Sequence, residues 1–248
     1  MESHILLSVI NFSSLETKVR FSISRKDYML CLKDLSLANK LDRFAKSDYT
    51  SSDAVAWNTY IGQIGEMLWY RFVESCGIPC YPPDFFPHSV SEYPNRTKLW
   101  GNDLILDCDL RVLNKKGNNI FFSRHTWIKT QARSQSNRFG TSFLIQKNTL
   151  TRKADPLLSK PNEKSLVLFC VIDNLLGDDF YNPPLDYKCY GNLYLSFWPW
   201  IIRGNYLDKP KKKELRNSKY AIYLDKLSKD CKLIVPAKIF DSKNIVAE

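Results

Sequence analysis

Three side chains in the middle of the chain have the types and spacing of a hydrolytic site. Glu66 falls in a segment predicted to be helical, Asp103 begins a predicted strand, and Lys129 lies deep in the next one. Phosphodiester hydrolysis uses a divalent ion that polarises the phosphate and lowers the pKa of its bound water, and Mg²⁺ prefers carboxylate oxygens. A strand-held lysine can orient that water and neutralise charge developing on the phosphate. We therefore expect metal-assisted chemistry, with Glu66 and Asp103 as ligands of Mg²⁺, for which Mn²⁺ substitutes.

The positions of Asp103 and Lys129 can be checked against the hairpin that the sequence predicts. Residues Leu104–Val112 and Ile120–Gln131 are strand-like, and residues 114–118 between them are turn formers. If the turn centres on Lys116, Asp103 lies thirteen residues before it and Lys129 thirteen after it. An antiparallel register then places the two side by side at the open end of the hairpin.

Other polar residues of this hairpin are candidates for the same site. Gln131 shares a strand face with Lys129 and could hold the water or a phosphate oxygen. Asp107 and Asp109 share the face of Asp103 but lie nearer the turn, so they are reserve metal ligands. A bulge in the strand would bring Asp109 into the place of Asp103.

Glu66 belongs to the best-defined element of the sequence, a predicted helix over Ala54–Glu74 that contains no proline and ends at Gly77. The positions next to Glu66 on the helix surface, 62, 69, 70 and 73, are Gly, Trp, Tyr and Val, which predicts an inward-facing glutamate. The alternatives are structural: Glu66 as an exposed helical glutamate, and Lys129 as an edge-strand lysine that blocks aggregation.

The remaining pattern predicts an α/β or α+β fold with helices flanking a sheet. Segments 1–50 and 236–248 are expected to be an N-terminal segment packed on the core and a tail around a core of residues 51–235, together one compact domain. The further predicted elements are strands Val19–Ile23, Phe143–Gln146, Ser165–Asp173 and Leu193–Trp200, helices Lys26–Ala45 and Tyr220–Leu227, and a loop Ile78–Pro94.

The charge of the chain favours a polyanionic partner. Lys and Arg total 36 against 26 Asp and Glu, a formal net charge of +10. The seven cysteines form no CxxC pair and no zinc-ligand cluster, so we expect free thiols in the cytoplasm, with no signal peptide or membrane anchor. The basic residues expected to contact nucleic acid, or alternatively to form a solvated basic face, are Arg124, Arg133, Arg138, Lys211, Lys212 and Lys213.

Residues 54–172 resemble the PD-(D/E)xK nucleases, and more closely their divergent phage or mobile-element members. The resemblance rests on the helical segment Gly62–Glu66, on Asn102-Asp103 where the family has Pro-Asp, and on Ile128–Gln131, which is similar to the family's Val-Lys-Thr-Gln strand. It implies a restriction-endonuclease-like fold, a mixed central sheet flanked by helices. It also implies Mg²⁺-dependent cleavage of nucleic acid, and we expect a DNA endonuclease that could act as a homodimer.

The chain departs from the family pattern at one position. Trp127 stands where the family has an acid two residues before the lysine, so the strand itself provides no second metal ligand. Either Glu66 takes over this role, which we favour because the ion needs oxygens at the right distance and not from a given strand, or the site is impaired. The alternative function is therefore a nuclease-fold protein that binds nucleic acid or takes part in an assembly without cleaving.

Overall fold

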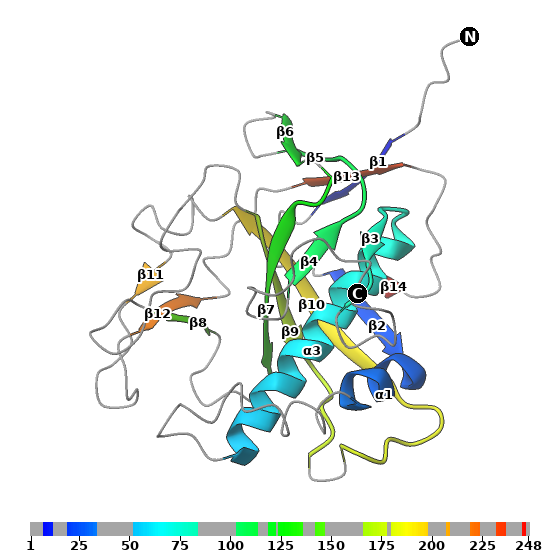
Figure 1. Ribbon diagram of the computed structural model, residues 1–248, viewed down its shortest axis with the longest axis vertical. Coiled ribbons are helices and arrows are strands. Elements are labelled where there is room, and N and C mark those ends of the chain that lie inside the picture. Colours follow the sequence, from blue (N-terminus) through cyan, green and yellow to red (C-terminus); the bar gives the residue numbers. More distant parts are fainter. Residues whose placement is uncertain are drawn as a thin grey trace.

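A seven-stranded mixed sheet forms the centre of the computed structural model (Figure 1). Strands β7 and β9 are parallel, and the other neighbours in the sheet are antiparallel. In spatial order the strands are β14 (Ile245–Val246), β2 (Val19–Ser24), β10 (Lys188–Phe197), β9 (Leu166–Ile172), β7 (Trp127–Ser134), β4 (Asp103–Leu106) and β3 (Cys80–Tyr81). The fold is thus α+β with a mixed central sheet, as the sequence predicts.

The structure describes residues 7–11, 19–33, 52–83, 103–113, 119–122, 124–135, 142–146, 166–177, 180–197, 207–208, 219–223, 232–236 and 245–246. All structural statements below concern these residues. The predictions for residues 34–45, 84–94, 198–200 and 224–227 lie outside them, as does Cys231.

The apolar run in β9 explains its central position. Its residues from Val167 to Ile172 are all buried, with exposed fractions from 0% to 5%, although they alternate between the two faces of the sheet. A strand with no polar face is stable only when both faces are covered. The prediction of a strand buried on both faces is confirmed.

The two described helices, α3 (Ser52–Ser75) and α1 (Arg25–Lys33), lie on one face of the sheet, and α3 crosses it obliquely (Figure 1). The predicted end of α3 is confirmed: Gly77 has a φ of 71°, and the N–H groups of Gly77 and Ile78 donate to the carbonyls of Glu74 and Val73. This is the bonding of a Schellman motif, which favours glycine at this position.

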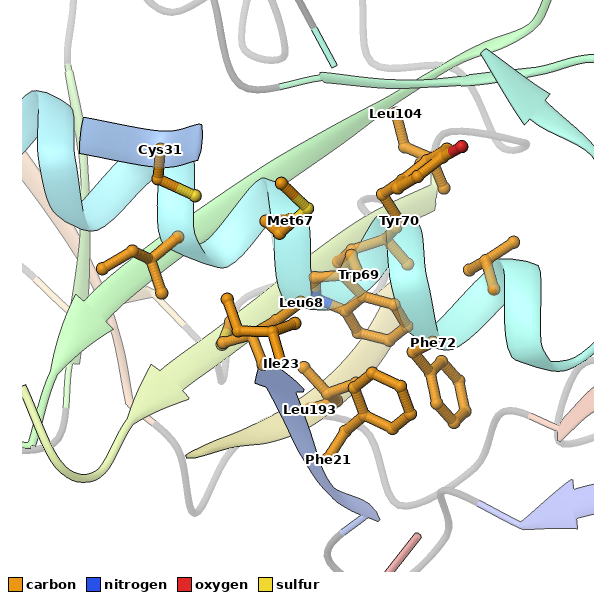
Figure 2. Close-up of a cluster of buried hydrophobic side chains, with 14 of the residues drawn as sticks. Phe21, Ile23, Cys31, Met67, Leu68, Trp69, Tyr70, Phe72, Leu104 and Leu193 are labelled. Atoms are coloured by element: carbon orange, nitrogen blue, oxygen red, sulfur yellow. The ribbon is translucent and has the colours of Figure 1, made fainter. Parts of the chain in front are cut away.

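The core lies between α3 and the sheet. Trp69, Phe72 and Phe21 are fully or almost fully buried there, with Tyr70 and Leu104 in the same cluster (Figure 2). The indole N–H of Trp69 donates to the carbonyl oxygen of Phe169 in β9 at 3.1 Å. The helix is therefore fixed to the sheet both by apolar packing and by a hydrogen bond to a strand backbone.

Two smaller sheets accompany the central one (Figure 1). The first contains β1 (Leu7–Asn11), β13 (Lys232–Pro236), β5 (Leu110–Leu113) and β6 (Asn119–Phe122), in that order. The second contains β11 (Leu207–Asp208), β12 (Lys219–Tyr223) and β8 (Ser142–Gln146).

The predicted helix at Tyr220–Leu227 is wrong in its described part. Residues Lys219–Tyr223 form β12, which pairs with β8 on one side and β11 on the other. The segment reads Lys-Tyr-Ala-Ile-Tyr, and its aromatic and β-branched residues favour a strand. Pairing with a strand on each side stabilises this segment as a strand in place of the short amphipathic helix.

Both ends of the chain contribute to the sheets. Strand β2 and helix α1, from the predicted N-terminal segment, belong to the central sheet and its core, and Ile245–Val246 of the predicted tail pairs with β2. Six cysteines, 31, 76, 80, 108, 170 and 189, are free, as expected. In the part of the chain that the structure describes, no helix is long and apolar enough to span a membrane.

Candidate functional site

The predicted register of the hairpin is confirmed: Asp103 of β4 pairs with Lys129 of β7. Nearer the turn, Leu110 pairs with Phe122, and this pair is also symmetric about position 116. Because both parts share one register, the hairpin contains no net bulge between them. The shift that would have put Asp109 in the place of Asp103 does not occur.

The predicted strand Leu104–Val112 is nevertheless two strands, β4 and β5, in different sheets. Residues 107–109 interrupt it, and on the other arm His125 adopts a positive φ of 66°. The backbone N–H of Leu106 still donates to Thr126 on the other arm, and that of Asp107 donates to the carbonyl of Pro79, next to β3, at 2.8 Å. The hairpin bends here, which separates Asp107 and Asp109 from the sheet that contains Asp103.

Alternation along β7 divides its residues between two faces of the sheet. Ile128 and Ala132 belong to the core under α3, so Lys129, Gln131 and Arg133 lie on the opposite face. Lys129 and Gln131 are half-buried there. The expected common face of Lys129 and Gln131 is confirmed.

Arg133 is less accessible than its sequence context suggests, at 3% exposure. Its guanidinium donates to the carbonyls of Ser134 and Gln135, at 3.2 and 3.5 Å. Burial lowers the pKa of this guanidinium. Its described surroundings are those of a residue at the end of the strand and not of a residue that grips phosphate from solvent.

Glu66 is buried, at 5% exposure, which confirms the predicted inward face of the helix. The preceding residue, Gly65, stands directly over Ala132 of β7, whose Cα lies 3.5 Å from the position that a Cβ on Gly65 would take. Ala132 is three residues from Lys129, or about 10 Å along a strand. The helix thus brings Glu66 to the same stretch of β7 as Lys129, but from the other face of the strand.

The reserve ligands Asp107 and Asp109 lie at the bend, at the far end of β4 from Asp103. Asp107 accepts from the guanidinium of Arg124 at 2.6 and 2.7 Å, and Asp109 accepts from the backbone N–H of Arg124 at 2.8 Å. These bonds with Arg124 lower the pKa of Asp107. The structure therefore groups Arg124 with the reserve acids and not with Lys129. Arg138 and Lys211, Lys212 and Lys213 lie outside the described residues.

The residues present suit a hard divalent ion. Mg²⁺ retains several waters and uses one or two carboxylates together with substrate phosphates. Asp103 and Glu66 are of this type, but Asp103 is opposite Lys129 in register and Glu66 comes from the other face of the sheet, so one ion could bind both only beyond the end of β4. Within the described ranges, no three His, Cys, Asp or Glu side chains gather closely enough to hold a metal ion by themselves. The donor set thus fits an ion completed by water and substrate better than a closed protein site.

We compared the chain with protein-family models, curated proteins and solved structures. None of them matches. Its function is therefore inferred from the residues and geometry of this chain.

Two residues of α3 that sequence reasoning did not single out as functional, Gly65 and Trp69, contact the sheet on either side of Glu66 in the sequence. A glycine inside a helix lowers stability by about 1 kcal/mol relative to alanine. A glycine in an otherwise regular helix therefore indicates a close packing contact, and it is the one sign of this contact in the sequence. The hydrogen bond of Trp69 to a strand carbonyl could not be predicted from the sequence pattern. It depends on a strand one hundred residues away.

Proposed function

We propose that this protein is a divalent-metal-dependent nuclease with a restriction-endonuclease-like fold that hydrolyses phosphodiester bonds in DNA as an endonuclease. The observation that carries the proposal is the pairing of Asp103 with Lys129 in adjacent strands of the central sheet. The parallel pairing of β7 with the buried β9 supports it, because it makes Lys129 part of a rigid scaffold. A rigid scaffold is what positions a catalytic group accurately.

Each residue has a defined task in this proposal. Mg²⁺, when bound, polarises the scissile phosphate and activates water, and Asp103 and Glu66 would hold it. Lys129 presents an ammonium that neutralises charge developing on the phosphate, without reorganisation during the reaction. Gln131, on the same face, holds a water or phosphate oxygen by hydrogen bonding. The net charge of +10 brings the polyanion to the protein.

A second candidate function is supported by Trp127. The backbone of this residue pairs with Ile105, two positions before Lys129, where the family that the sequence resembles has an acid. If Glu66 does not supply the missing oxygen, the protein would bind nucleic acid through its positive charge without cleaving it. That function predicts salt-sensitive binding without turnover.

The proposal is tested with the purified full chain, supercoiled plasmid and circular single-stranded DNA, in Mg²⁺ or Mn²⁺. We expect nicking or linearisation by the wild type, and a loss of at least about 1000-fold in Lys129→Ala, because an electrostatic stabiliser of the transition state contributes about this much. Lys188→Ala is the matched control. Lys188 is an exposed lysine at the start of β10 in the same sheet, and its variant should cleave at the wild-type rate.

Circular dichroism verifies that both variants are folded. Full activity in a folded Lys129→Ala protein would end the nuclease proposal. Metal-independent binding that weakens with salt, in a wild type that cleaves neither substrate, would establish the second function instead.

A further inference from the structure

We infer that Gly65 and Trp69 are positioning residues that determine the place of Glu66 over the catalytic strand: Gly65 fixes the distance between α3 and β7, and Trp69 fixes the rotation of the helix. This inference rests on the proposed function and on the part of Glu66 in it. The geometry that points to it consists of two contacts that flank Glu66 on the same helix.

The first contact is a close approach that only glycine permits. A Cβ on Gly65 would overlap the Cβ of Ala132 and would lie 3.5 Å from the Ala132 Cα and 3.7 Å from the Cβ of Cys170. The atoms in the way belong to the strand and cannot rotate aside. The helix would have to move outward by about 1 Å before this contact became an ordinary van der Waals distance.

The second contact fixes the helix about its own axis. The Trp69 side chain has no exposed surface, and its indole N–H donates to the Phe169 carbonyl at 3.1 Å. Trp69 follows Gly65 by one helical turn, so the two contacts lie on the sheet-facing side of the same turn. Glu66 lies between them in the sequence, so we expect its carboxylate to move when either contact changes.

A displacement of about 1 Å matters more for chemistry than for folding, because a misplacement of this size can cost about 100-fold in rate. Gly65→Ala should therefore lower kcat by about 10- to 100-fold at a temperature where the protein is fully folded. It should also reduce the rise in melting temperature that Mn²⁺ causes, because Glu66 is displaced from the ion. Trp69→Phe keeps an aromatic ring, though a smaller one, and removes the donor, so it should lower kcat by a smaller factor, about 10-fold.

Two glycine variants provide matched controls. Gly191→Ala disturbs the same interface, since its Cβ would lie 2.7 Å from Leu68 Cδ1 and 2.9 Å from Cys170 Sγ. These atoms end flexible side chains, so the core repacks while the helix backbone stays in place: the melting temperature should fall with kcat unchanged. At Gly177 a Cβ would have no neighbour within 4 Å, and Gly177→Ala should change neither quantity.

Rescue separates positioning from general packing. In the double variant Gly65→Ala with Ala132→Gly, the overlapping Cβ on the strand is gone, and the remaining contacts of the new Cβ are 3.5 and 3.7 Å. We expect this variant to regain kcat to within about threefold of the wild type, and to regain the Mn²⁺-induced rise in melting temperature. The rescue applies even if Gly65→Ala alone does not fold.

The outcomes are distinct. An inactive wild type refutes the proposed function. If the wild type is active, any of three results refutes the positioning role and leaves the proposed function intact. The first is a folded Gly65→Ala with normal kcat and a normal Mn²⁺ response, and the second is a loss of kcat in Gly191→Ala to the same extent. The third is a double variant that is inactive or unfolded. Loss in Gly65→Ala with recovery in the double variant establishes it.

Discussion

A single hairpin of this protein brings an aspartate and a cation together at two places, and their surroundings differ. At the inner end, Asp103 pairs with Lys129 within the central sheet, beside a strand that is buried on both faces. At the bend, Asp107 forms an ion pair with Arg124, and these side chains are 35% and 58% exposed. Water and salt screen the second pair, which therefore contributes little to stability.

The difference shows why residue type alone does not identify a catalytic acid. Asp103, Asp107 and Asp109 are separated by four and two residues, and each has a basic residue on the opposite arm of the hairpin: Lys129 for Asp103, and Arg124 for the other two. Only Asp103 shares a sheet with the strand on which the helix of Glu66 packs. We therefore expect the two ends of the hairpin to respond very differently to the same substitution.

The largest difference is expected between Asp103→Asn and Asp107→Asn. The first removes a proposed metal ligand and should reduce cleavage by about 1000-fold, as the loss of a strong electrostatic interaction in a transition state does. The second removes a charge at the exposed bend and should change the rate less than threefold. Rates of plasmid nicking at saturating Mg²⁺ measure the effects of both substitutions. Equal losses of activity would show that Asp103 is no more important for cleavage than Asp107.

Glu66→Gln is expected to have the next largest effect, about 100-fold on kcat. The amide keeps the size of the side chain but binds a divalent ion weakly, so the Mn²⁺-induced rise in melting temperature should also shrink. Glu74 is an exposed glutamate two turns later on the same helix. Glu74→Gln is therefore the control, and it should retain both the wild-type kcat and the Mn²⁺-induced rise in melting temperature. Normal metal binding and cleavage in Glu66→Gln would show that the helix supplies no ligand.

Trp127→Glu places an acid two residues before Lys129 and should sharpen the contrast between the two ends. An added carboxylate raises the number of oxygens available to the ion, so the Mg²⁺ concentration for half-maximal cleavage should fall by about 10-fold. Titration of cleavage against Mg²⁺ measures this shift. An unchanged Mg²⁺ requirement, in a folded variant, would mean that position 127 has no access to the ion.

The smallest effect is expected at the bend, in the pH dependence of stability. Arg124 lowers the pKa of Asp107 in the folded state below its unfolded value of about 3.9, so the pair stabilises the protein above that pH and loses its effect as pH falls through the folded-state value. The melting temperature of Arg124→Ala should lie within about 2 °C of the wild type at pH 7. The gap should close below about pH 4, as thermal melts across pH would reveal; a gap that widens there would contradict this assignment.

The sequence allowed much of this hairpin to be predicted, because an antiparallel register follows from the position of the turn. A turn centred on Lys116 predicts that Asp103 is opposite Lys129, and the pair Leu110 and Phe122 is symmetric about the same residue. The break at residues 107–109 could not be predicted, since β4 pairs on its outer side with β3 whereas β5 pairs with β13, and both partners are distant in the sequence. The same limitation led to the wrong helix at Tyr220, where the pairing with β8 and β11 decides.

The site was predicted in part for the same reason. Burial of Glu66 followed from its helix neighbours, a local pattern. Its approach from the opposite face of β7, and the burial of Arg133, depend on how the helix and the sheet pack together. Contacts of this kind, as between Gly65 and Ala132, involve residues far apart in the sequence and leave only a weak local signal, such as a glycine inside a helix.

The pairing of β2 has a consequence for how the chain folds during synthesis. Its neighbours in the sheet are β10 and β14, and Ser24 pairs with Lys188, 164 residues later. At about 5–20 residues per second, a ribosome needs about 10–30 s to make the intervening chain, so β2 has no partner in the sheet for that time. Strands β4 and β7 lie much closer in the sequence, with Asp103 and Lys129 only 26 residues apart, and can pair much earlier. The hairpin that contains Asp103 and Lys129 should thus form before the sheet around it is complete, and non-local pairing of this kind makes the final step slow.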